Sequence, residues 1–192
     1  YGKISCFSFY PTKNLSAIGD AGAILTNNNK IYTKLKSLRS YGWNKVRESK
    51  MFGRNSRIDE LQSSLLNIKL KKLDKENTLR KNKANFYLKH IKNDKIILPK
   101  INNGSSHVFH LFVIRTKKRD KLIKFLKEKK IQTAIHYKLP NHQHKYLSKK
   151  IKIKFKPKIT NKLAKEILSI PLYPSLSIKD QKKIVVAINK FK

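Results

Sequence analysis

The segment Cys6-Phe-Ser-Phe-Tyr-Pro-Thr-Lys-Asn-Leu15, followed closely by Ile18-Gly-Asp-Ala-Gly-Ala-Ile24, decides the fold of this chain. Apolar residues lead up to Pro11, which ends the run, and a second short apolar run follows the Gly-Asp turn. The pattern predicts two strands, over residues 3–10 and 21–26, joined by a tight connection. Lys13 is expected on that connection, just beyond the first strand.

A lysine in such a place has the setting that Schiff-base chemistry needs. That chemistry requires an amine held within bonding reach of an aldehyde, and partial removal from water supplies neutral amine near pH 7 by lowering the pKa. The alternative is a solvated surface charge, which is the ordinary role of most of the 39 lysines in this chain. The residues around Lys13 decide between the two.

Those residues resemble the active-site segment of the DegT/DnrJ/EryC1/StrS sugar aminotransferases, which depend on pyridoxal phosphate (PLP). The resemblance is unbroken on both sides of the lysine and extends over Gly19-Asp-Ala-Gly-Ala23. It implies that Lys13 binds PLP through a Schiff base and that Ser8 hydrogen-bonds the cofactor phosphate. Without that context, Ser8 would be interpreted as a strand hydroxyl bonded to backbone.

A second segment, Asn55-Ser-Arg-Ile-Asp-Glu-Leu-Gln62, has two interpretations. Propensity alone predicts a helix capped by Asn55 or Ser56, with Asp59 or Glu60 in its first turn. Its buried face would hold Leu61, Leu65, Ile68 and Leu73. The segment also resembles the second signature of the family, whose Asn reaches the PLP phosphate of the other subunit. Asn55 therefore implies a homodimer, and its 42-residue spacing from Lys13 suits that correspondence.

Beyond these signatures the apolar pattern predicts alternating helices and strands. Helices are expected over residues 30–40, 73–93, 119–130 and 161–168, and a last one is capped by Ser177 and Asp180. Strands are expected over residues 107–116 and 131–135, while residues 150–156 alternate as in an edge strand or a loop. The resemblance implies that residues 1–95 are the end of a large PLP-binding domain and that residues 96–192 form a small C-terminal domain.

Three histidines fall within His136-Tyr-Lys-Leu-Pro-Asn-His-Gln-His144. Their spacing matches no common ligand pattern, and Pro140 breaks any helical face, so we expect no metal site. The family has a similar stretch near its sugar-nucleotide substrate. The resemblance therefore implies that His136 and Tyr137, together with Tyr10, line the substrate pocket.

The formal charge of +35 indicates another class, a basic protein that binds nucleic acid. However, only 7 of the bases are Arg, and they are spread along the chain rather than gathered in one arm. Lys, Asn and Ile enriched together are what AT-rich codons encode, so we rank this class second and expect no specific nucleic-acid partner. The single cysteine, Cys6, fits a reduced cytoplasmic setting, and no apolar stretch reaches the length of a membrane span.

The resemblance covers nearly all of the chain but only the second half of the family's length, so we expect a piece of a longer protein that is unstable and inactive alone. It implies an α/β fold of the aspartate-aminotransferase type (PLP fold type I). The implied activity transfers an amino group from an amino acid, expected to be glutamate, to a nucleotide-linked keto sugar.

The signatures and His107-Val-Phe-His-Leu-Phe-Val-Ile-Arg-Thr-Lys117 look most like the transaminases that make dTDP-3-amino-3,6-dideoxyhexoses, so a dTDP-3-keto-6-deoxyhexose is the expected substrate. The alternative substrates are 4-keto sugars. Two further classes share the fold, a dehydratase group with His in place of the lysine and a non-catalytic regulator. Lys13 argues against the dehydratase. Lys130 stands where the family often has Gly.

Overall fold

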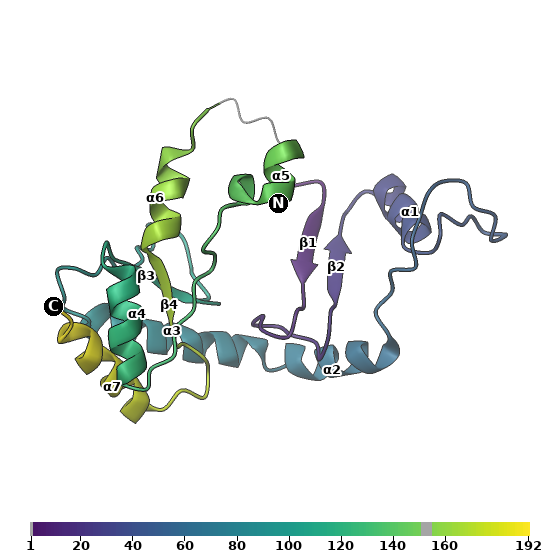
Figure 1. The fold of residues 1–192 in the computed structure, drawn as a ribbon. Helices are drawn as coiled ribbons and strands as arrows, with labels where there is room; N and C mark the ends of the chain where they lie inside the picture. The colour runs from purple at the N-terminus through teal and green to yellow at the C-terminus, as the bar shows by residue number, and fades with distance from the viewer. Residues whose placement is uncertain (1, 151–154) are drawn as a thin grey trace. The chain divides into compact units, whose positions relative to one another are not determined.

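The computed structural model describes residues 2–150 and 155–192 (Figure 1). The chain divides into two compact units, Tyr1–Lys75 and Glu76–Lys192. Both contain helices and strands, as expected of an α/β protein. The domain boundary that the sequence predicts between residues 95 and 96 remains a prediction.

The first unit is built on a two-stranded antiparallel sheet. β1 (Ser5–Ser8) pairs with β2 (Gly22–Leu25), with Ser8 opposite Gly22. Both strands lie inside the ranges that the sequence predicts. Glycine is needed at position 22, because a Cβ atom there would come within 2.7 Å of the Phe7 carbonyl oxygen.

Two helices follow this sheet in the first unit. α1 (Asn29–Leu38) begins after Asn28, whose side chain accepts a hydrogen bond from the Ile31 backbone at 3.1 Å. α2 (Glu60–Leu70) begins after Asp59, whose carboxylate accepts one from the Gln62 backbone at 2.8 Å. The prediction that Asn55 or Ser56 caps this helix is therefore wrong, because both lie before its first turn.

The predicted buried face of α2 is wrong at two of its residues, although Leu65 and Leu73 are partly buried. Leu61 and Ile68 are 66% and 55% exposed, whereas Leu66 is the buried residue of the helix. A helical period places apolar residues on one stripe, but it does not say what covers that stripe. A different face of α2 makes polar contacts with the loop between β1 and β2.

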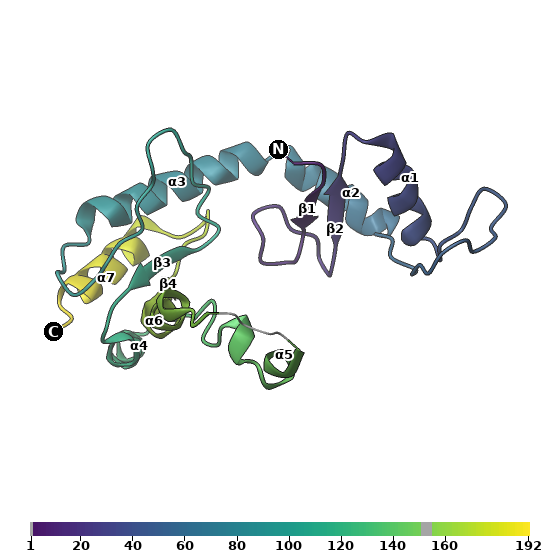
Figure 2. The ribbon, with the colours of Figure 1, turned by 90° about the horizontal axis from the view of Figure 1, so that it is seen from above.

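The second unit surrounds the antiparallel pair β3 (Phe112–Arg115) and β4 (Ile167–Ile170), in which Phe112 lies opposite Ile170. Its helices are α3 (Leu73–His90, which begins just before the division between the units), α4 (Arg119–Glu128), α5 (Lys145–Lys150), α6 (Lys158–Glu166) and α7 (Ile178–Asn189), with a 3-10 turn, η1, over Asn141–Gln143. Figure 2 shows α3 and α7 on one side of the strand pair and α4 and α6 on the other.

An apolar core lies between these layers. Its fully buried side chains include Phe109, Phe112, Ile114, Leu122, Leu126, Leu168 and Ile188. The rings of Tyr87 and Phe112 meet edge to face at 5.1 Å, and the Tyr87 hydroxyl donates to the Pro171 carbonyl at 2.8 Å. Burial raises the pKa of Tyr87, which keeps this hydroxyl protonated as a donor.

Most predicted helices are confirmed with small shifts of their ends. The helices expected over 30–40, 73–93 and 119–130 are α1, α3 and α4. α7 is capped as predicted, because the Ser177 hydroxyl accepts from the Asp180 backbone at 3.0 Å and donates to its carboxylate at 2.6 Å. Among the residues that the structure describes, no helix is long and apolar enough to cross a membrane.

The strands of the second unit are shorter than predicted. The strand expected over 107–116 is confined to β3, because Phe109 takes a left-handed backbone conformation (φ 44°) that interrupts an extended chain. The strand expected over 131–135 is a single bridge between Ala134 and Ser169.

The remaining predictions concern the segment before β4. The helix expected over 161–168 is α6, which ends at Glu166, so that Leu168 belongs to β4. The alternating stretch at 150–156 has its centre, residues 151–154, outside the described residues.

Candidate functional site

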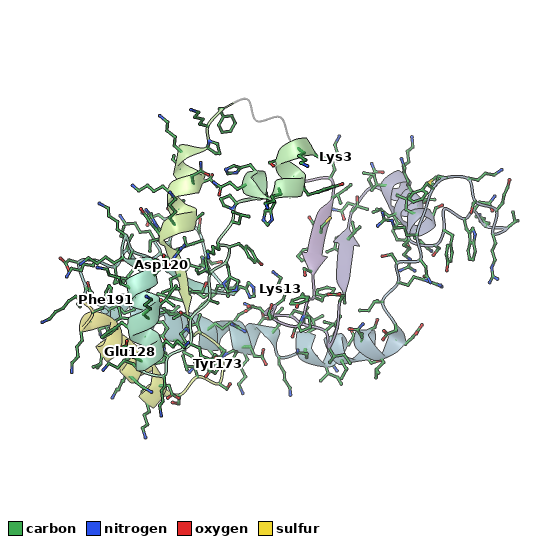
Figure 3. All side chains as sticks on the ribbon, in the orientation of Figure 1. Lys3, Lys13, Asp120, Glu128, Tyr173 and Phe191 are labelled. Atoms are coloured by element: carbon green, nitrogen blue, oxygen red, sulfur yellow. The ribbon has the colours of Figure 1, made fainter. Side chains whose placement is uncertain are left out.

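Lys13 lies on the loop between β1 and β2, as the sequence predicts (Figure 3). Its backbone N–H donates to the Tyr10 carbonyl at 2.8 Å, which closes a turn. The loop is also closed at its base, because the Phe9 N–H donates to Ala21 at 2.8 Å and the Phe9 carbonyl accepts from Ala17 at 2.7 Å. Lys13 is partly buried, and its place on the loop is fixed by these backbone hydrogen bonds.

Ser8 and Tyr10 lie on the same segment as Lys13. Ser8 ends β1, and its exposed hydroxyl accepts a hydrogen bond from the Tyr10 N–H at 3.3 Å. Tyr10 begins the loop with its side chain about half exposed. The structure therefore brings three of the predicted site residues onto one strand end and the turn that follows it.

α2 contacts this loop at two places. The Gly19 N–H donates to the Gln62 side-chain oxygen at 3.0 Å, and the Lys69 ammonium donates to the Ser16 hydroxyl. The sequence predicts Gln62 only as part of a signature, and neither Lys69 nor Ser16 was predicted to contact the site. A signal was present in the seven-residue spacing of Gln62 and Lys69, which puts both on one helix face.

Asn55 lies at a small polar cavity beside this loop. The cavity has a volume of about 250 Å³ and is lined by residues 20–22 and 55–58. The Asn55 side-chain oxygen accepts a hydrogen bond from the Arg57 guanidinium at 3.0 Å, and its backbone bridges to Ser40. Gly22, which is paired with Ser8 across the sheet, lines the cavity, whereas Ser8 and Lys13 do not.

His136 and Tyr137 belong to the second unit, after the segment that bridges to β4. The ring Nδ1 of His136 lies 2.8 Å from the hydroxyl of buried Ser169, and the exposed Tyr137 ring meets the His136 ring edge to face at 5.5 Å. Ser169 was missed as a partner of His136, because the two residues are 33 positions apart.

His142, the second of the three histidines between residues 136 and 144, has a hydrogen-bond partner. His142 Nε2 lies 2.7 Å from the Asn161 side-chain oxygen, which also accepts from Gln143 at 2.8 Å, so η1 is tied to α6. Within residues 2–150 and 155–192, no three His, Cys, Asp or Glu side chains gather in a way that would hold a metal ion.

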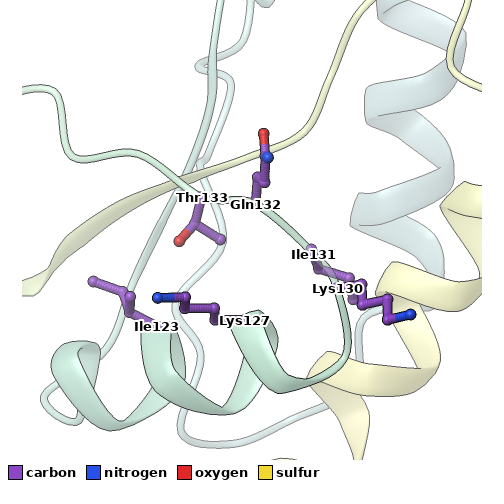
Figure 4. Close-up of a pocket in the computed structure, with 6 residues that line it drawn as sticks. All are labelled: Ile123, Lys127, Lys130, Ile131, Gln132 and Thr133. Carbon is purple, nitrogen blue, oxygen red and sulfur yellow. The ribbon is translucent and has the colours of Figure 1, made fainter.

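A separate cavity of about 440 Å³ lies over α4 and the segment that follows it (Figure 4). Its lining residues are Ile123, Lys127, Lys130, Ile131, Gln132 and Thr133. None of the predicted site residues lines it, and its two lysines are exposed charges at the end of a helix. We therefore do not assign the site to this cavity.

The residues around the first loop have chemistry that fits a phosphorylated aldehyde. Lys13 supplies a primary amine on a fixed turn, and Ser8 supplies an exposed hydroxyl at the strand end. The polar cavity adds the amide of Asn55 and the guanidinium of Arg57, which are donors suited to an anion. This donor set is compatible with PLP.

Known proteins share this arrangement of elements. A dTDP-3-amino-3,6-dideoxy-α-D-galactopyranose transaminase of Aneurinibacillus thermoaerophilus is 43% identical over 190 residues, which are 99% of this chain and 52% of that protein. A pleiotropic regulatory protein of Geobacillus stearothermophilus is 38% identical over 194 residues, which are 99% of this chain and 52% of that protein. The solved structure of S. venezuelae DesV in complex with a ketimine intermediate is 32% identical with a TM-score of 0.93, over 98% of this chain and 52% of that one.

The superposition on DesV confirms the predicted α/β fold. The chain spans about half the length of the curated relatives it matches. Residues 1–189 match the model of one family over almost the whole chain. The chain therefore belongs to the DegT/DnrJ/EryC1/StrS aminotransferase family.

Proposed function

We propose that the complete protein is a PLP-dependent aminotransferase that moves an amino group from glutamate to a nucleotide-linked keto-deoxysugar, with dTDP-3-keto-6-deoxyhexose as the preferred class. The observation that carries this proposal is Lys13, a partly buried lysine on a hydrogen-bonded turn inside the family's signature. The names of two relatives, both transaminases of dTDP-3-amino deoxysugars, support the substrate class. 4-keto sugars are the alternative substrates.

PLP, when bound, supplies an electron sink for the bonds around the donor's α-carbon. Lys13 would hold the cofactor through its amine, and as a free amine it would be the base that takes the proton from that carbon. The turn closed by the Lys13 N–H and the Tyr10 carbonyl limits where this amine can reach. Fixing the amine in this way removes part of the entropic cost of the proton transfer.

Ser8 and Asn55 are proposed to bind the cofactor phosphate. Both carry side chains that donate a hydrogen bond to an anion, and both are exposed. Asn55 is proposed to complete the site of a second subunit, which makes the active protein a homodimer. Tyr10, His136 and Tyr137 are proposed to line the sugar pocket, with the Ser169 hydroxyl orienting the His136 ring. A cytoplasmic location and a role in polysaccharide biosynthesis complete the proposal.

The decisive experiment uses the complete protein and two lysine variants. Borohydride reduction of the wild type, followed by peptide mapping, is expected to leave a pyridoxyl mass on the peptide that contains Lys13. Lys13→Ala is expected to remove both the label and turnover, whereas Lys3→Ala, which changes an exposed lysine of the same segment, is expected to keep both (Figure 3). Full turnover by Lys13→Ala would refute the assignment.

A second candidate is a regulator on the same fold, which the name of the Geobacillus stearothermophilus relative supports. The two candidates differ in whether the complete protein binds PLP and catalyses amination. An absorbance band of bound PLP together with glutamate-dependent amination of the 3-keto sugar would favour the enzyme. Absence of both from the purified complete protein would favour the regulator.

A further inference from the structure

Three side chains of α2 lie along the face that meets the Lys13 loop. Gln62, Leu66 and Lys69 are spaced four and three residues apart, so they share one stripe of the helix. Leu66 is buried, and on the loop side Ser16 and Ala17 are the buried residues. The two polar members of the stripe contact the loop at Gly19 and Ser16. Figures 1 and 2 show the connection between β1 and β2 beside α2.

We infer that α2 positions the Lys13 loop, with Gln62 and Lys69 as the two positioning residues that fix it behind the reactive amine. The inference rests on the proposed function, because it assigns these residues a part in the reaction of Lys13. It gives the second signature a role beyond Asn55, since Gln62 is the last residue of that signature.

The Gln62 amide is oriented by two partners of opposite kind. Its oxygen accepts from the Gly19 N–H at 3.0 Å, and its nitrogen donates to the Asp59 carboxylate at 3.3 Å. The backbone and side-chain hydrogen bonds from Gln62 lower the pKa of Asp59, so the carboxylate is an acceptor at neutral pH. Only a side chain with one acceptor and one donor at this length satisfies both partners.

Lys69 holds the loop from a second point two turns further along α2. Its ammonium donates to the Ser16 hydroxyl, and both side chains are at least partly buried. Ser16 lies three residues after Lys13, and Gly19 lies six after it. The two contacts therefore fix the half of the loop that follows the reactive lysine, while the Phe9 backbone fixes its base.

The test compares Gln62→Ala with Asn67→Ala in the complete, PLP-loaded protein. Asn67 is an exposed polar residue of the same helix, so its variant controls for the loss of an amide from α2. Gln62→Ala is expected to lower kcat about 10- to 100-fold, because small misplacement of a reacting group costs up to that much. KM for the donor is expected to stay within about twofold, and amide exchange of residues 14–20 to accelerate about tenfold.

Gln62→Glu separates positioning from simple loss of packing. Glutamate keeps the length and the acceptor for Gly19, but it places a carboxylate beside Asp59 and loses the donor. Its kcat relative to wild type at the same pH is expected to be lowered at pH 8 and partly restored near pH 5, where one of the two carboxyls takes up a proton. Ser16→Ala, which breaks the Lys69 contact from the loop side and leaves α2 unchanged, is expected to give the same exchange pattern as Gln62→Ala.

Failure of this inference can be distinguished from failure of the proposed function. If wild type lacks the Lys13 label and turnover, the proposed function fails, whereas exchange at residues 14–20 still tests the contacts. If wild type is active and both Gln62→Ala and Ser16→Ala match Asn67→Ala in kcat and in exchange, the inference is overturned. Faster exchange confined to residues 14–20 together with lowered kcat would support it.

Discussion

At the scale of single residues, Lys130 has a backbone conformation that usually belongs to glycine. Its φ of 58° lies in the left-handed region, and it follows the last residues of α4. The Lys130 N–H donates to Lys127 and the Ile131 N–H to Leu126, both at 2.9 Å, which is the pattern of a Schellman C-cap. The turn is therefore formed here with a lysine at the position where glycine is most favourable.

Replacing this lysine with glycine is therefore expected to stabilise the second unit. Lys130→Gly removes the clash between Cβ and backbone that left-handed residues carry, a gain of about 1 kcal/mol in the free energy of unfolding. Lys130→Ala keeps the Cβ atom and loses the same charge, so it serves as the control and is expected to show no such gain. Urea unfolding of the two variants measures the difference, and equal stabilities would contradict the prediction.

The residues of the candidate site differ in how far the sequence predicts them. Lys13 and Ser8 lie within one short motif, so their placement on a strand end and its turn follows from local pattern. Ser169 and His136 meet across 33 positions, and Gln62 meets Gly19 across 43. Such pairs depend on how the strands and helices pack, which no local pattern contains.

At the scale of elements, the capping residue of a helix was predictable only where the chain offers a single candidate. Ser177 and Asp180 form the single pair that suits the start of α7, and the structure confirms it. Before α2 the chain offers Asn55, Ser56 and Asp59 as alternatives, and the register of the first turn selects Asp59. The buried face of α2 was not predictable, because its stripe is met by a polar loop rather than by an apolar core.

The cap of α7 is expected to be worth a measurable part of the stability of the second unit. Ser177→Ala leaves the Asp180 N–H without its acceptor and is expected to lower the free energy of unfolding by about 1 kcal/mol. Ser177→Asp retains a side-chain oxygen at the cap and is expected to cost less. Ser175→Ala, at an exposed position just before the cap, is the control. A Ser177→Ala variant as stable as Ser175→Ala would show that the cap contributes nothing.

At the scale of the whole molecule, the two units differ sharply in how much apolar surface they bury. The largest fully buried side chains, among the residues described, all belong to the second unit, from Tyr87 to Ile188. In the first unit, Phe7, Ile24 and Leu25 of the two-stranded sheet are 51%, 50% and 57% exposed. Burial of apolar surface is the main favourable term in folding, so stability is expected to be unequal along the chain.

Amide hydrogen exchange on the 192-residue chain should reveal this inequality. A sheet of two strands is marginal in water without a covering layer, so β1 and β2 are expected to exchange with little protection. Amides of β3, β4 and α7, which enclose the core of the second unit, are expected to exchange at least about 100-fold more slowly. In the complete protein, β1 and β2 are expected to gain protection, because their exposed apolar side chains need partners that the 192 residues do not provide. Equal protection of the two sheets in the isolated chain would mean that the first unit is stable by itself and that its exposed apolar residues need no such cover.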